Sequence, residues 1–145
     1  MNPRRKILSA ALSALLIAPF AGATAQMAPA DRTHKVVFQV SDGDPAKWNL
    51  TLNNARNVQQ DLGSDKVAIE IVAYGPGIGM LKMDSATGAR VTDAMASGIS
   101  VVACENTMKS LKLTRDDMLP KIGYVPAGVV ELMTRQKEGY AYIRP

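Results

Sequence analysis

The chain has 145 residues, with 17 basic and 13 acidic ones, and three of the basic residues but none of the acidic ones lie within the first 25 positions. Without that stretch 14 basic residues face 13 acidic ones, which excludes an electrostatic basis for binding nucleic acid. The single cysteine and single histidine exclude an internal disulfide and a typical zinc site.

The first 25 residues have the pattern of an export signal. The basic run Arg4-Arg5-Lys6 precedes an uncharged apolar run at 7–20. Ala21-Gly22-Ala23 and Ala23-Thr24-Ala25 are both small-residue cleavage sites, and cleavage after Ala25 is favoured. The apolar run is shorter than the roughly 20 residues that cross a bilayer, which favours a cleaved signal over a membrane anchor. The arginine pair matches a twin-arginine signal only in part, so the general secretory route is favoured. We predict a signal peptide at 1–25 and a periplasmic protein with no membrane association after cleavage.

A flexible linker is predicted at 26–34, followed by one domain of residues 35–145. Strands are expected where β-branched residues cluster, and Asp44 before Pro45 is a favourable helix start. The glycine-rich segment 75–79 breaks the chain after the second strand. The elements predicted in this half are a strand at 35–40, a helix at 46–62, a strand at 66–74, a short helical piece at 80–84 and a helix at 87–97.

The second half continues the alternation of strands and helices. Val129, Val130 and Met133 are predicted to face inward from the last helix. The elements predicted are a strand at 99–103, a helix from 105, a short helical piece at 114–118, a strand at 121–125, a helix at 127–137 and an edge strand at 140–143. Such regular alternation predicts a single three-layer α/β domain, with a mostly parallel five-stranded sheet and helices on both faces.

The only cysteine, Cys104, follows the apolar run 99–103, where a strand ends and a helix begins. In a parallel sheet this junction lies at the carboxyl edge, where ligand crevices form. Backbone N–H groups at a helix start favour the thiolate. Free cysteines are also often buried and inert, so position alone leaves both interpretations open.

Four loops are predicted to share that edge, at 41–44, 75–79, 104–106 and 125–128. The glycine segment at 75–79 has either of two roles, an anion cradle or a tight turn, and it lacks the spacing of a nucleotide-binding motif. His34 is expected at the opposite edge of the sheet, which removes a histidine base for Cys104. Asp42 and Asp44 are explained as a turn residue and a helix N-cap residue.

Three segments together resemble the DsrE/DsrF-like family. They are Gly98-Ile-Ser-Val-Val-Ala-Cys104-Glu-Asn-Thr-Met, the upstream Tyr74-Gly-Pro-Gly, and the downstream Val125-Pro-Ala-Gly-Val-Val followed by Arg135-Gln-Lys-Glu-Gly-Tyr-Ala-Tyr-Ile143. The resemblance covers 35–145 and implies a parallel α/β fold and homo-oligomers, trimers or hexamers. In the sulfur-relay members a cysteine at this position carries a persulfide, which implies the same for Cys104. The relay members are cytoplasmic, and after the cysteine they favour small apolar residues where this chain has Glu105-Asn106-Thr107.

The leading hypothesis is a periplasmic carrier of sulfane sulfur that acts through Cys104 without a cofactor or a metal. It is a carrier or transferase rather than a turnover enzyme, with a sulfur donor or acceptor protein as partner. Backbone N–H groups of Glu105 and Asn106 are expected to favour the thiolate. The other residues predicted to line the site are Gly75, Gly77, Gly79, Pro126 and Gly128.

Two other hypotheses stay open. One is a non-catalytic oligomeric module that binds a small ligand at the same edge, with Cys104 as an inert filler. The other is a structural exported protein whose subunits meet through Met80, Leu81 and Met83. Native-state reactivity of the thiol distinguishes the first of these from the carrier.

Overall fold

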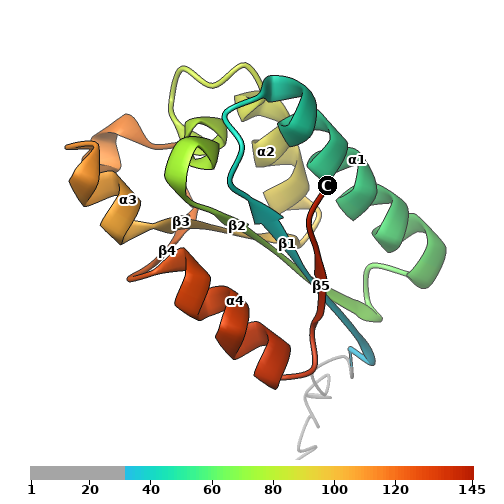
Figure 1. Cartoon of the computed structure of the whole chain (residues 1–145). Coiled ribbons are helices and arrows are strands. Elements are labelled where there is room, and N and C mark those ends of the chain that lie inside the picture. Colours follow the sequence, from blue (N-terminus) through green and yellow to red (C-terminus); the bar gives the residue numbers. More distant parts are fainter. Residues whose placement is uncertain (1–31) are drawn as a thin grey trace, which may run out of the picture.

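The computed structural model describes residues 32–145, which form a five-stranded parallel sheet with helices on both faces (Figure 1). The predicted fold class is confirmed. The strands are β1 (His34–Val40), β2 (Val67–Ala73), β3 (Ser100–Cys104), β4 (Gly123–Val125) and β5 (Ala141–Ile143). The α-helices are α1 (Pro45–Leu62), α2 (Gly88–Ala96), α3 (Glu105–Ser110) and α4 (Gly128–Lys137), and the 3-10 helices are η1 (Gly75–Leu81) and η2 (Arg115–Asp117).

The predicted signal peptide at 1–25 and most of the predicted linker at 26–34 lie outside the described residues. Within 32–145, no helix has both the length and the apolar character needed to span a membrane. The helix start predicted at Asp44 is present, because the Asp44 carboxylate accepts a hydrogen bond of 2.8 Å from the Ala46 N–H, and Pro45 opens α1.

The strand order β4-β3-β2-β1-β5 determines which face each helix covers. The chain adds β2, β3 and β4 in one direction from β1, so right-handed crossovers place α1 and α2 on one face. The last crossover runs back across the sheet from β4 to β5, so α4 lies on the opposite face (Figure 1).

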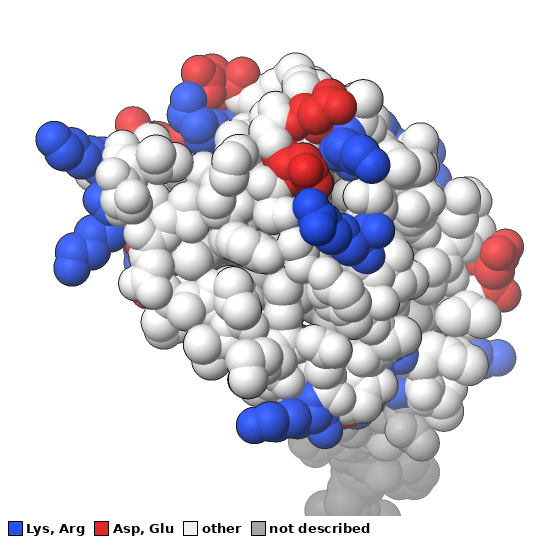
Figure 2. Space-filling view, in the orientation of Figure 1, with Lys and Arg blue, Asp and Glu red and all other residues white. Residues whose placement is uncertain are grey.

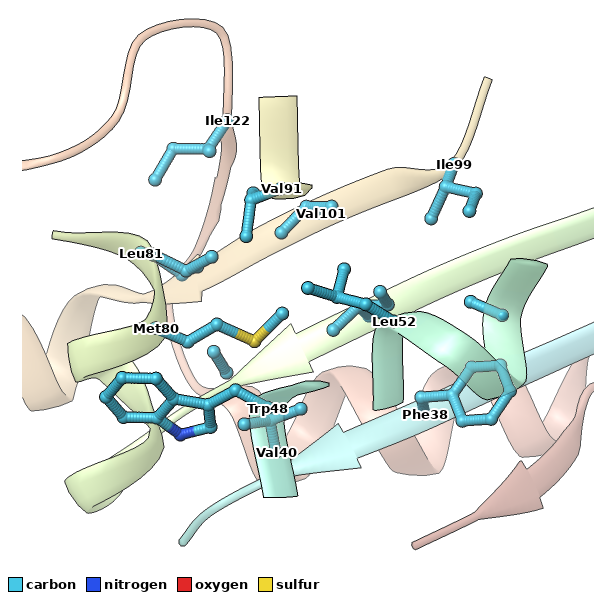
Figure 3. Close-up of a cluster of buried hydrophobic side chains, with 14 of the residues drawn as sticks. Phe38, Val40, Trp48, Leu52, Met80, Leu81, Val91, Ile99, Val101 and Ile122 are labelled. Carbon is cyan, nitrogen blue, oxygen red and sulfur yellow. The ribbon is translucent and has the colours of Figure 1, made fainter. Parts of the chain in front are cut away.

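The main core lies between the sheet and the α1–α2 layer. Phe38, Trp48, Leu52, Met80 and Leu81 belong to this core and have little or no exposure, and Figure 3 shows Leu52 between Phe38 on one side and Trp48, Met80 and Leu81 on the other. Burial of these large side chains is the main source of folding free energy, at about 25 cal/mol for each Å² of apolar surface.

A smaller core lies between the sheet and α4. Leu132 of α4 packs there against Val37, Val72 and Val102 of the three central strands. This face needs fewer apolar residues, because among the described helices α4 alone covers it.

The prediction that Val129, Val130 and Met133 face inward is wrong. Their side chains are 53%, 59% and 54% exposed, and the buried residues of α4 are Gly128 and Leu132. Helical spacing allows either the stripe of Val129, Val130 and Met133 or the stripe of Gly128 and Leu132 to face the sheet. The stripe with Gly128 is the buried one, because a glycine lets the helix approach the strands closely. An apolar stripe is therefore left on the surface.

The segment after β2 also differs from its prediction. Residues 75–79 do not simply break the chain, since they begin the 3-10 helix η1, which extends to Leu81. Met80 and Leu81 have no exposed surface, so the proposed contact patch of Met80, Leu81 and Met83 does not exist as a surface. Only Met83, 60% exposed, lies outside the core.

Candidate functional site

Cys104 is the last residue of β3 and lies between the ends of two neighbouring strands. Ala103 pairs with Ala73 of β2, so Tyr74 follows on one side, and Cys104 itself pairs with Val125 of β4 on the other. Side chains alternate along a strand, so Cys104 faces the same side of the sheet as Val102, toward α4. The thiol is 5% exposed.

The start of α4 passes directly over this strand end. Gly128 is buried, and a Cβ atom at this position would lie 3.0 Å from the Tyr74 Cβ, so only glycine fits without displacing its neighbour. The Asn106 N–H donates to the Pro126 carbonyl at 3.1 Å, which joins the start of α3 to the loop before α4. Two helix starts thus meet at the thiol.

Cys104 occupies the N-cap position of α3, and its side chain makes no capping hydrogen bond to this helix. Burial raises the pKa of the Cys104 thiol, but hydrogen bonds from the Thr107 hydroxyl and from the N–H groups of Gly128, Thr107 and Asn106 outweigh it. The net result is a pKa below the ordinary value for cysteine, because each of these donors stabilises the thiolate.

The structure brings only part of the predicted residue set to the thiol. Asn106 and Gly128 both act to lower the pKa of the thiol, and the Asn106 N–H donates to the Pro126 carbonyl. Glu105 contributes no donor, and its carboxylate instead pairs with Arg115 at 3.2 Å on the surface.

The three glycines of η1 have different surroundings. Gly77 packs against the backbone of Val40 at the end of β1, and Gly79 packs against the indole of Trp48. Only the Gly75 N–H points toward the site, and it donates to the Thr107 Oγ1 at 2.9 Å. The glycine segment is thus mainly a device for close packing.

Sequence reasoning missed Thr107, whose hydroxyl and N–H both act to lower the pKa of the Cys104 thiol. The signal was available, since a hydroxyl three residues after an N-cap is well placed to reach the cap side chain. Tyr74 was quoted only as part of a family motif, although its ring lies against Gly128.

A surface hollow of about 380 Å³ lies beside this arrangement. Its walls come from η1 and α3, with Thr107 at their junction. The lining residues are Gly75, Pro76, Asn106, Thr107, Ser110 and Leu111. None of them is charged, so the hollow suits an uncharged or apolar group.

No histidine base is available to the thiol. His34, the only histidine, begins β1 at the amino edge of the sheet, whereas Cys104 ends β3 at the carboxyl edge. Among residues 32–145, no group of three His, Cys, Asp or Glu side chains is placed to hold a metal ion. The thiolate is therefore favoured by the hydrogen-bond donors around Cys104 and not by proton transfer to a histidine.

Fold and site define a parallel α/β protein with one polarised thiol at the carboxyl edge of its sheet. The model of the DsrE/DsrF-like family matches residues 34–145. The chain belongs to this family. Among curated proteins, none matches it.

Two solved structures are similar to the chain. The protein of unknown function MTH1491 from Methanobacterium thermoautotrophicum has 38% identity and a TM-score of 0.74, over 77% of this chain and 99% of that one. The conserved protein of unknown function BT1422 from Bacteroides thetaiotaomicron has 16% identity and a TM-score of 0.63, over 79% and 97%. The second likeness concerns the fold alone.

Proposed function

We propose that the chain is a periplasmic carrier of sulfane sulfur, which Cys104 holds as a persulfide. The observation that carries this proposal is the position of Cys104 at the end of β3, where the starts of α3 and α4 meet and their N–H groups lower the pKa of the thiol. Membership of the DsrE/DsrF-like family supports it.

The transfer step is a thiolate exchange. The Cys104 thiolate attacks the outer sulfur of a persulfide or a thiosulfonate donor, so that a new S–S bond forms at Cys104 while the S–S bond of the donor breaks. The donor leaves with the electron pair, as a thiolate or a sulfinate. An acceptor thiolate reverses the step by attacking the outer sulfur, and Cys104 leaves as the thiolate. The same donors that stabilise the thiolate favour it as the leaving group.

Replacing Cys104 by serine is expected to abolish sulfur loading. Intact mass measured on protein purified from the native periplasm should show a gain of about one sulfur atom, lost on reduction, in the parent chain and not in Cys104→Ser. The same spectrum tests export, because the proposed cleavage removes residues 1–25.

Parent protein alkylated at Cys104 before loading is the matched control, since it keeps the native sequence. A Cys104→Ser chain that still gains reductant-sensitive sulfur would contradict the carrier. A thiol that stays unmodified, and resists alkylation until the protein unfolds, would also contradict it.

The second candidate is a non-catalytic binding module. It is favoured by the 5% exposure of Cys104 and by the uncharged hollow of about 380 Å³ beside it. In that function the hollow holds a small apolar ligand and the cysteine fills space. Retained binding of the ligand by Cys104→Ser, together with an inert thiol, distinguishes it from the carrier.

Self-association is part of the same proposal, as the family resemblance implies trimers or hexamers. The exposed stripe of Val129, Val130 and Met133 on α4 is the surface that we assign to a second copy of the chain. Figure 2 shows that the surface over α4 is largely free of charged residues. An apolar stripe of this kind loses contact with water when another stripe covers it.

A charge placed on this stripe is expected to dissociate the oligomer. Met133→Lys should reduce the mass measured by light scattering to that of one chain, because a buried unpaired ammonium is costly. Met83→Lys is the matched control, since Met83 is similarly exposed, at 60% against 54%, but lies far from α4 in the chain. A monomeric parent chain, or dissociation by Met83→Lys alone, would overturn the assignment.

A further inference from the structure

A second hollow, of about 500 Å³, lies at the other end of β3 from Cys104. It is found where the first residues of β3 have no neighbouring strand on one side, because β4 begins at Gly123, opposite Val102. The end of α2 forms one wall, and the segment that leads into β4 forms another. The hollow is larger than the one beside Thr107 and has the size of a small-molecule site.

The lining of this hollow is largely apolar, with methionine, isoleucine, valine and proline side chains, and no acidic side chain takes part in it. Its two hydroxyl groups already have partners within the protein. The Thr92 Oγ1 donates to the Gly88 carbonyl at 3.1 Å. The Ser100 Oγ donates to the Glu70 carboxylate at 3.3 Å. Neither hydroxyl proton is therefore free for a ligand.

Lys121 is the one charged residue that lines the hollow. Within residues 32–145 it belongs to no ion pair. Its backbone has a φ of 68°, in the left-handed region where glycine is favoured over residues with a side chain. A lysine is thus held in an unfavourable conformation beside an apolar hollow, and its ammonium has no partner among the described side chains.

We propose that this hollow binds a small apolar carboxylate. The hydrocarbon part of the ligand lies against α2 and β3, where its burial removes apolar surface from water. The carboxylate pairs with the Lys121 ammonium. A single ammonium matches a single negative charge, which favours a carboxylate over a phosphate ester of higher charge. The site is separate from Cys104, and its occupancy does not depend on the proposed sulfur chemistry.

Octanoate is the probe for this site. It is titrated into the full mature chain while the backbone amides are followed by nuclear magnetic resonance. We expect shifts at Ser100, Val101 and Lys121 that saturate at about millimolar concentration or below. The absence of a saturable shift, or saturable shifts confined to residues away from the hollow, would overturn the proposal.

The charge of Lys121 is tested with a glycine, which suits the positive φ and should leave the chain folded. Lys121→Gly is expected to bind octanoate about fivefold more weakly, as the loss of an exposed ion pair predicts, and to bind uncharged octanol as the parent does. Lys112→Gly is the matched control, because Lys112 also has a positive φ, 55°, and lies outside the hollow. Unchanged octanoate affinity in Lys121→Gly, or an equal loss in Lys112→Gly, would contradict the pairing.

The apolar part of the site is tested by filling it. Ala96 is the exposed last residue of α2 and lines the hollow, so Ala96→Trp is expected to abolish the binding of both probes. Ala89→Trp, exposed on the same helix but outside the hollow, should bind them as the parent does. Octanoate binding that survives in Ala96→Trp would overturn the site. So would amide resonances of Ser100 and Val101 that respond to protein concentration and not to octanoate, since a second copy of the chain would then cover the hollow.

Discussion

Gly77→Ala is expected to lower the free energy of unfolding by more than about 3 kcal/mol, because the new methyl group has no room. Its Cβ would lie 2.2 Å from the carbonyl oxygen of Val40 and 2.9 Å from the backbone nitrogen of Ser41. That carbonyl cannot simply turn away, since it accepts the Tyr74 N–H at 3.1 Å. The clash is therefore with backbone at the end of β1, and chemical denaturation measures its cost.

Gly75→Ala is the matched control on the same 3-10 helix. No heavy atom lies within 4 Å of a Cβ built at Gly75, so only its φ of 52° opposes the substitution. An alanine in that left-handed conformation costs about 1 kcal/mol. Equal losses for the two variants would show that backbone conformation, and not contact with β1, determines the need for glycine in this segment.

Arg135→Met is expected to cost about 3 kcal/mol of stability, because it leaves a buried carboxylate without its cation. The guanidinium of Arg135 donates to both oxygens of Glu70, at 3.0 and 2.9 Å, and the Glu70 side chain is 4% exposed. Glu131 lies 2.9 Å from the same guanidinium. Without Arg135 the two carboxylates would repel each other beneath α4.

The loss should depend on pH in a defined direction. Burial, and then the charge of Glu70, raises the pKa of Glu131, whereas Arg135 opposes this rise. In Arg135→Met the folded state therefore binds protons more readily than the unfolded state does, and its stability increases as pH falls through the raised pKa. Denaturation at several pH values should show the gap to the parent narrowing toward acid.

Two further variants test the cause of this loss. Lys137→Met removes an exposed cation from the same helix and should change stability by less than about 0.5 kcal/mol. Adding Glu70→Gln to Arg135→Met removes the buried charge and should recover much of the loss. If the double variant is as unstable as Arg135→Met, lost packing by the arginine stem, and not the unpaired charge, accounts for the effect.

The position of Cys104 could be predicted from local pattern alone. A β-branched run followed by a helical pattern locates a strand end, and the alternation of elements indicates a parallel sheet, whose strand ends share one edge. The same reasoning places His34 at the other edge. These predictions succeed because strand and helix patterns depend only on residues that are close together in the sequence.

The long-range contacts around the thiol could not be predicted in this way. The bond between Gly75 and Thr107 and the approach of Gly128 to Tyr74 join residues that are distant in sequence. They exist because β2, β3 and β4 are adjacent in the sheet with a particular register. Neither adjacency nor register is fixed by the periodicity of any one strand.

The last helix shows the same difference between what local sequence predicts and what long-range contacts decide. Its amphipathic pattern was enough to predict a helix at 127–137, but the inward stripe was assigned to Val129, Val130 and Met133, which lie on the surface. By itself the sequence determined the order and type of the strands and α-helices, the parallel α/β class and the strand-end cysteine, since these follow from local backbone preference and periodicity. Only the tertiary structure decided which side of α4 is buried and that Gly128 lies beside the thiol, because both depend on how closely two distant segments of backbone can approach.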